Sequence, residues 1–176
     1  MMLILAAILS VILTLFAITF LILEIYVGII GNLKGAPFVP SKPSPIKTMV
    51  ELAGVTLGTR VVDLGSGDGS ILIEAARKGA VATGIEINPF LIPYSRWRAK
   101  RAGMQDRVTV IKGNINDVPI QDTQVVFVYL LPKFLAKLKP RFASELKPGT
   151  RIVSNAFPIP GWTPVQKKNG VFLYQI

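Results

Sequence analysis

A glycine-rich turn between an apolar run and a helical segment restricts most strongly how this chain can fold. The stretch VVDLGSGDG occupies residues 61–69, and ILIEAARKG, with the apolar spacing of a helix, follows it. This order predicts a buried strand, a tight loop and a helix start. Glycine permits positive φ and close approach to the main chain, and the first helical turn has unpaired N–H groups. We therefore expect a ligand to bind at this loop.

Strand-like and helix-like segments alternate along most of the chain. The predicted strands are residues 60–64, 81–87, 108–112, 125–130 and 151–155, and the predicted helices are 46–53, 71–78, 90–102 and 132–146. This alternation predicts an α/β fold, in which helices cover both faces of a parallel, Rossmann-like sheet. The tail differs, because residues 163–176 contain two short strand-like runs around Asn169-Gly170, the signal of a tight antiparallel hairpin.

An uncharged apolar run lies near the N-terminus. Residues 3–23 contain only Ser10, Thr14 and Thr19 as polar side chains, and a helix of this length extends roughly 32 Å, enough to cross a bilayer core. A cleaved signal peptide is the competing interpretation, but the run lacks a basic n-region and a small-x-small site. We expect a transmembrane anchor over residues 1–33, a proline-rich connector over 34–45 and an α/β domain over 46–176.

Positive charge follows the apolar run. The chain has 20 Lys and Arg residues against 10 Asp and Glu, and the first basic residue is Lys34. The positive-inside rule therefore places the domain of a single-pass protein on the cytoplasmic side. Basic residues also form two predicted helical faces. Such faces are usually solvated surfaces, and attraction to anionic lipid headgroups is the alternative interpretation. One comprises Lys133, Lys137 and Arg141, and the other comprises Arg96, Arg98, Lys100 and Arg101.

The absence of cysteine and histidine limits the available chemistry. With neither residue, the chain can form no disulfide, thiolate nucleophile or imidazole base, and no zinc site built on these residues. No metal site is expected. Catalysis must depend on positioning, backbone groups, carboxylates, tyrosine or a cofactor.

Acidic residues decide between the candidate ligands of the loop. In the dinucleotide fingerprint G-x-G-x-x-G the third glycine falls on Ser70, and a pyrophosphate would meet the charges of Asp63 and Asp68. S-adenosylmethionine has no phosphate, and its ammonium suits Asp63. Glu86 ends the second predicted strand, and its two oxygens can accept both ribose hydroxyls. We therefore predict S-adenosylmethionine as the cofactor, which disfavours an NAD-dependent oxidoreductase.

Two motifs support a wider resemblance. DLGSGDG (63–69) and GIEINP (84–89) resemble the first and second motifs of the class I, seven-stranded S-adenosylmethionine-dependent methyltransferases, whose sheet ends in such a hairpin. Further segments resemble the membrane-associated protein-lysine methyltransferases that modify the ATP synthase c-subunit and the adenine nucleotide translocase, with their prokaryotic relatives. These segments are PFVPS (37–41), NPFLIPYSRWRA (88–99), YLLP (129–132), ELKPGTRIVS (145–154) and FPIPGW (157–162). The resemblance covers residues 37–176, and that family's N-terminal hydrophobic segment is matched too.

The resemblance implies a seven-stranded, mostly parallel sheet and a set of cofactor contacts. These contacts are Pro40, Ser41, Asp63, Gly65, Ser66, Gly67, Glu86, Asn88 and Asn114. Pro40 and Ser41 would cover the methionine end of the cofactor. Asn114 stands where many relatives have Asp, so weaker recognition of the adenine amino group is expected.

The resemblance also implies an acceptor site at the end of the fourth predicted strand. Tyr129 would orient the attacking amine, and Pro132 and Trp162 would shape its channel. Packing is the alternative role for Tyr129, and stapling of the proline-rich loop is the alternative for Trp162.

The motifs that the sequence lacks restrict the class of methyl acceptor. Without cysteine the chain cannot methylate cytosine C5 through a covalent adduct, and YLLP lacks the Asn/Asp-Pro-Pro-aromatic pattern that holds a nucleobase amine, so nucleic acid is not an expected partner. We predict N-methylation of a lysine in a membrane protein, with the lipid bilayer as a further partner. The expected location is a membrane, specifically the mitochondrial inner membrane in a eukaryote. A lipid or quinone headgroup methyltransferase and a catalytically silent S-adenosylmethionine-binding membrane protein are the alternatives.

Overall fold

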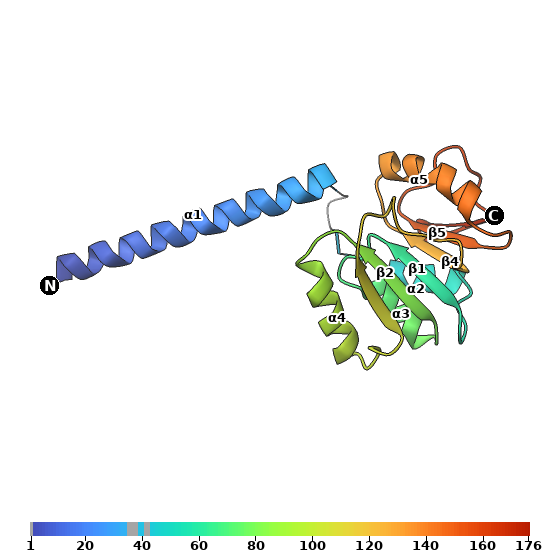
Figure 1. The fold of residues 1–176 in the computed structure, drawn as a ribbon, viewed down its shortest axis with the longest axis horizontal. Coiled ribbons are helices and arrows are strands. Elements are labelled where there is room, and N and C mark those ends of the chain that lie inside the picture. The colour runs from blue at the N-terminus through green and yellow to red at the C-terminus, as the bar shows by residue number, and fades with distance from the viewer. Residues whose placement is uncertain (1, 35–38, 41–42) are drawn as a thin grey trace. The chain divides into compact units, whose positions relative to one another are not determined.

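The computed structural model describes residues 2–34, 39–40 and 43–176, and the chain divides into two compact units, Met1–Pro37 and Phe38–Ile176 (Figure 1). The first unit contains the helix α1 (Met2–Lys34). Every side chain from residue 6 to residue 25 is exposed, and the two threonine hydroxyls donate within the helix, Thr14 to the Ser10 carbonyl (2.9 Å) and Thr19 to the Leu15 carbonyl (2.8 Å). Among the described residues, α1 is the one helix long and apolar enough to cross a membrane, a test that signal sequences also pass.

A seven-stranded sheet forms the second unit, in the order β3-β2-β1-β4-β5-β7-β6. Its strands are β1 (Arg60–Leu64), β2 (Val81–Glu86), β3 (Val108–Lys112), β4 (Val125–Val128), β5 (Arg151–Asn155), β6 (Gln166–Lys168) and β7 (Val171–Gln175). The strands β1 to β5 pair in parallel, whereas β7 is antiparallel to both β5 and β6. This topology confirms the predicted fold class, including the C-terminal hairpin.

The hairpin turn and the helices follow local signals in the sequence. Asn169 and Gly170 have φ of 50° and 76°, as a two-residue hairpin turn requires. The helices of the domain are α2 (Pro43–Leu52), α3 (Ser70–Arg77), α4 (Leu91–Arg101) and α5 (Pro132–Glu145). The first of them begins at Pro43 instead of residue 46, because a proline suits the first position of a helix.

Helices cover both faces of the sheet. On one face, Met49 of α2 and Leu72 of α3 belong to a buried cluster with the strand residues Val61, Phe127 and Val153. Residues Leu135, Leu138 and Phe142 of α5 are fully buried outside this cluster, and Figure 1 shows α5 on the other side of the sheet from α2 and α3. The sheet is therefore the middle layer of three.

The strand register aligns the residues that end the parallel strands. Leu64 pairs with Ile85 of β2 and with Val128 of β4, and Val128 pairs with Ser154 of β5. The next residue after each of these four therefore lies in the same row at the carboxyl edge of the sheet. These residues are Glu86, Gly65, Tyr129 and Asn155.

Gly84 of β2 supports the loop that follows β1. A Cβ atom at this position would lie 2.5 Å from Leu72 Cδ1 and 2.5 Å from Ser66 Oγ, and both of these side chains are buried. We predict that Gly84→Ala lowers the free energy of unfolding of the full chain by about 1–3 kcal/mol, measured by chemical denaturation. Gly113→Ala is the matched control with a milder contact, 3.0 Å from Val118 Cγ2. Equal losses in the two variants would contradict this steric account.

Candidate functional site

The glycine loop runs from β1 to α3 and is tied to β2. Gly65 and Ser66 both donate their backbone N–H to the Ile85 carbonyl, at 2.9 and 3.0 Å. Gly65 has φ of 84°, and a Cβ on it would approach Leu130 Cδ2 to 3.3 Å. A left-handed backbone this close to its neighbours requires glycine at this position. The predicted order of strand, tight loop and helix is confirmed.

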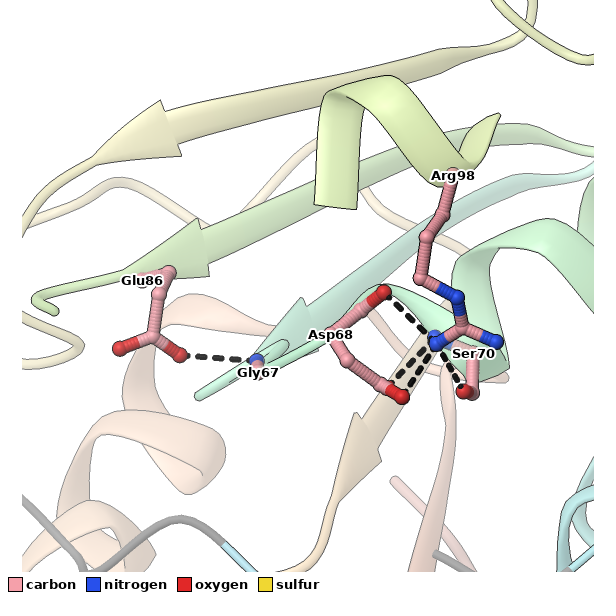
Figure 2. Close-up of polar contacts among 5 residues, drawn as sticks. All are labelled: Gly67, Asp68, Ser70, Glu86 and Arg98. Carbon is pink, nitrogen blue, oxygen red and sulfur yellow. Dashed lines mark hydrogen bonds and ion pairs between the residues drawn. The ribbon is translucent and has the colours of Figure 1, made fainter. Parts of the chain in front are cut away.

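Glu86 is buried and holds the loop in place. Its Oε2 accepts the Gly67 N–H at 2.8 Å (Figure 2), and its Oε1 accepts the N–H groups of Ile87 (2.9 Å) and Asn88 (2.7 Å). A carboxylate offers about four lone-pair positions, so three backbone donors leave room for roughly one further hydrogen bond. Both predicted ribose hydroxyls could bind only if a backbone donor were exchanged.

The Asn88 side chain acts locally in this structure. Its Oδ1 accepts the Phe90 N–H at 3.0 Å, which shapes the turn leading into α4. The predicted contact between this side chain and a cofactor therefore remains a prediction.

Asp63 is the buried acid at the end of β1, with 2% of its surface exposed. Desolvation, followed by the charges of Glu86 and Asp68, raises the pKa of Asp63 to about 8. A carboxyl group in this setting is stabilised by a proton or by a cation placed beside it. The acid therefore favours a positively charged guest.

The charge of Asp68, unlike the charges of Asp63 and Glu86, is offset by an ion pair. Its carboxylate forms an ion pair with Arg98 of α4, and the same guanidinium nitrogen lies 2.7 Å from Ser70 Oγ (Figure 2). Asp68 Oδ1 also accepts the Ser70 N–H at 3.1 Å, at the start of α3. The electrostatic argument against a pyrophosphate consequently depends on Asp63 and Glu86, because Arg98 offsets Asp68.

Two further predicted cofactor contacts, Ser66 and Asn114, differ in their surroundings. Ser66 Oγ is buried against Gly84 and has no hydrogen-bond partner within the described part of the chain. Asn114 Oδ1 accepts both the backbone N–H (3.0 Å) and the side-chain Nδ2 (2.9 Å) of Asn116. Of the two connector residues, Pro40 is exposed and Ser41 lies outside the described residues.

Trp162, predicted to shape the acceptor channel, has a packing role in the structure. Its ring lies 6.4 Å from that of Phe142 and 6.1 Å from that of Tyr174, and the Tyr174 hydroxyl accepts the Ile159 N–H at 2.9 Å. These contacts staple the loop after β5 to the sheet. Tyr129 is half-buried just beyond β4, and Pro132 is the first residue of α5.

The end of β5 and the turn after it contain two residues that the sequence analysis did not single out for the site. Asn155 ends β5 at the level of Tyr129 with 6% of its surface exposed, and Ala156 has φ of 64°, unusual for a residue other than glycine. The Ala156 N–H donates to the Gly170 carbonyl (2.9 Å), and Ser154 Oγ donates to the Phe157 carbonyl (2.6 Å). Such fixed, strained backbone is common at functional sites. In the sequence, the polar Asn155 at the end of an apolar strand was the feature that could have indicated a site residue.

The sheet order, the glycine loop and the acid at the end of β2 together define a class I methyltransferase fold. A family model described as the ANTKMT methyltransferase domain matches residues 63–166, and the chain belongs to this family.

Similar proteins differ in their named acceptors. A protein-lysine N-methyltransferase of Saccharolobus islandicus is 41% identical over 130 residues, which cover 73% of this chain and 81% of that protein. The human ATP synthase c-subunit lysine N-methyltransferase is 36% identical over 128 residues, covering 73% of this chain and 54% of that protein. The chain thus spans about half the length of the human relative.

A solved structure gives the same fold with a different acceptor in its name. The crystal structure of an RNA methyltransferase from Salinibacter ruber in complex with S-adenosyl-L-homocysteine has a TM-score of 0.76 and 40% identity, covering 78% of this chain and 94% of that one.

The raised pKa of Asp63 makes the stability of the ligand-free protein depend on pH. Between the ordinary carboxyl pKa of 3.8 and about 8, the folded state holds a proton that the unfolded state releases, so the free energy of unfolding falls as pH rises. We predict that Asp63→Asn removes this decline, so that the variant gains melting temperature relative to wild type between pH 5 and pH 8. The exposed Asp106→Asn variant is the control. A constant difference between wild type and Asp63→Asn across this range would exclude the buried titration.

Proposed function

We propose that this chain is a membrane-anchored methyltransferase that uses S-adenosylmethionine to N-methylate a lysine of a membrane protein. The observation that carries the cofactor assignment is the pair of buried acids beside the glycine loop, Asp63 and Glu86. A phosphate next to these acids would meet the charge of Glu86 and would further disfavour ionisation of Asp63, whereas a cation favours the ionised form of Asp63. The ligand-bound structure of the Salinibacter relative is consistent with this choice.

The residues present fit the cofactor at both of its polar ends. The ammonium of its methionine part would lie beside Asp63, where a positive charge favours the ionised carboxylate and lowers its pKa. Glu86 would exchange a backbone donor for a ribose hydroxyl while keeping its hold on the loop. We propose that Pro40, Ser41, Ser66, Asn88 and Asn114 complete the site. When bound, the cofactor supplies an activated methyl group on a sulfonium.

Tyr129 and Asn155 are the side chains we propose for orienting the acceptor amine. They follow or end two adjacent strands at the same level as Gly65, where the methyl-bearing end of the cofactor would lie. An attacking lysine must be neutral, and a poorly solvated site lowers the pKa of its amine. The Tyr129 oxygen and the Asn155 amide oxygen can each accept an amine N–H, which fixes the direction of the nitrogen lone pair. We propose that Pro132 and Trp162 shape the channel around them.

The proposal of a membrane acceptor rests on α1 and on the named acceptors of relatives. The helix α1 exposes a mostly apolar surface over residues 6–25, in which Ser10, Thr14, Thr19 and Glu24 are the polar side chains, and a bilayer would cover that surface. We propose the division into an anchor (1–33), a connector (34–45) and a methyltransferase domain (46–176). The domain would face the cytoplasm, or act at the mitochondrial inner membrane in a eukaryote. Anchoring would raise the local concentration of the enzyme near membrane proteins.

RNA methylation is the second candidate function, because the Salinibacter protein is named an RNA methyltransferase at 40% identity. The segment after β4 is YLLP, which lacks the Asn/Asp-Pro-Pro-aromatic pattern that holds a nucleobase amine. The lysine acceptor is therefore favoured, and a lipid or quinone headgroup is the further alternative.

A single labelling experiment distinguishes these acceptors. The full chain is incubated with methyl-labelled S-adenosylmethionine and membranes from its source, and the label is followed through protease, nuclease and organic extraction. We predict protease-sensitive label that appears as methyl-lysine after acid hydrolysis, and its loss in Glu86→Ala because the ribose contact and the hold on Gly67 are both removed. Nuclease-sensitive label would support the RNA candidate, and organic-extractable label would support a lipid or quinone. S-adenosylhomocysteine binding without label in any fraction would indicate a silent binding protein.

If Tyr129 orients the acceptor amine, its substitution should impair catalysis without weakening cofactor binding. We predict that Tyr129→Phe lowers kcat by about tenfold or more, because the amine loses one orienting acceptor, on the scale of a lost hydrogen bond to a reacting group. Calorimetric affinity for S-adenosylhomocysteine should stay within about twofold of wild type. Thr109→Val, which removes an exposed hydroxyl from β3, away from the proposed site, is the control. An unchanged kcat in Tyr129→Phe would leave this residue with a packing role only.

A further inference from the structure

Exposed aromatic side chains of the α/β domain gather on one helix. Within residues 39–40 and 43–176, the exposed aromatic residues are Phe90, Tyr94 and Trp97, with 53%, 47% and 50% of their surfaces exposed. Their spacing of four and three residues places them on one side of α4 and the residue before it. Contiguous exposed apolar surface of this kind marks a site of interaction.

The aromatic rings are interleaved with cations. Tyr94 and Trp97 stack with ring centroids 5.8 Å apart and an interplanar angle of 22°. The Arg98 guanidinium lies 5.9 Å from the Tyr94 ring, and the Arg101 guanidinium lies 5.1 Å from the Trp97 ring. Each ring therefore has neighbours at its face, while about half of the surface of Tyr94 and of Trp97 remains exposed.

The charge of α4 is positive, and part of it faces outward. The sequence of α4 has no acidic residue, and its last turn contains Arg98, Lys100 and Arg101. Arg98 is paired with Asp68, and Arg96 donates to the Val110 carbonyl. The side chains of Lys100 and Arg101 are exposed beside the aromatic rings. The outward charge of α4 therefore lies next to its aromatic side.

A groove adjoins this surface. Its volume is about 540 Å³, and it lies between α2, α3 and α4. Apolar side chains, including Ile73 and Trp97, line the groove. Its two acidic residues, Asp68 and Glu74, are each paired with an arginine of the lining, so Lys47 and Arg101 leave the groove with a net positive charge. A partner with both a negatively charged group and apolar chains matches these linings.

We propose that the α4 surface, defined as Phe90, Tyr94, Trp97, Lys100 and Arg101, docks onto the headgroup region of an anionic bilayer. Tryptophan and tyrosine favour the membrane interface, where the apolar ring is buried and the polar group stays hydrated. Lysine and arginine are attracted to anionic lipids. Single-stranded RNA would need open ring faces for base stacking, and here the faces of Tyr94 and Trp97 contact each other and two arginines.

Docking through α4 would give the methyltransferase domain a defined orientation. The aromatic surface begins at Phe90, four residues after Glu86 at the carboxyl edge of the sheet. A bilayer in contact with Phe90 would therefore lie close to the edge where the acceptor amine is proposed to bind. This consequence rests on the proposed function, whereas the docking itself does not require catalysis. Lysines near the headgroups would be the accessible acceptors.

The two tryptophans allow a direct test in the full chain. Trp162→Phe leaves Trp97 as the single tryptophan reporter, and Trp97→Phe leaves Trp162 as its matched control. Each variant is placed in nanodiscs of phosphatidylcholine alone or with 30% phosphatidylglycerol, with and without brominated acyl chains. We expect Trp97 emission to shift to the blue and its quenching by brominated lipid to rise at least twofold in the anionic discs. Salt at 0.5 M should reverse both changes, since screening weakens the attraction.

Charge reversal supplies the second arm of the test. Lys100→Glu with Arg101→Glu should abolish the anionic dependence of Trp97 quenching, whereas Lys133→Glu with Lys137→Glu on α5 should preserve it. Identical Trp97 emission in the two disc types would overturn the proposal. Quenching by single-stranded RNA, with no response to anionic lipid, would also overturn it and favour a nucleic-acid partner. Turnover in detergent, measured separately, shows whether a negative result concerns docking or the methyltransferase itself.

Discussion

Two buried carboxylates at neighbouring strand ends are the constraint on which the site depends. Glu86 is stabilised by three backbone N–H groups, and in accepting them it fixes the glycine loop against β2. Asp63 lies in the same desolvated region, and its pKa is raised to about 8. The fold thus provides hydrogen-bond donors for Glu86, whereas Asp63 has a raised pKa and would be ionised only beside a cation. This division of roles explains why a phosphate-free, ammonium-bearing nucleoside is the proposed ligand.

The helix α4 connects this site to the exterior of the domain. On its inner side, Arg98 pairs with Asp68 and lies 2.7 Å from Ser70 Oγ, so α4 supports the loop that would hold the cofactor. On its outer side, Tyr94 and Trp97 form the stacked pair of the α4 surface. Because one short helix contributes both sides, the proposed docking at the α4 surface would also position the edge where the cofactor is proposed to bind.

The proposed acceptor side is shaped by the C-terminal hairpin. The Ala156 N–H donates to the Gly170 carbonyl in the hairpin turn, and Trp162 packs against Tyr174 of β7. These contacts hold the turn after β5 in a left-handed conformation next to Asn155. The antiparallel pair β6–β7 therefore forms one edge of the sheet and also fixes the backbone where an acceptor amine would be oriented.

Local patterns in the sequence by themselves determined the α/β alternation, the hairpin at Asn169-Gly170, the apolar helix α1 and the acid at the end of β2. These features depend on short-range periodicity and turn chemistry, which neighbouring residues decide. Only the tertiary structure paired Asp68 with Arg98, which are 30 positions apart, and committed the oxygens of Glu86 to backbone donors. It likewise aligned Asn155 with Tyr129 through the register of β4 and β5. Strand register and helix packing bring distant residues together, and no local pattern encodes which of them meet.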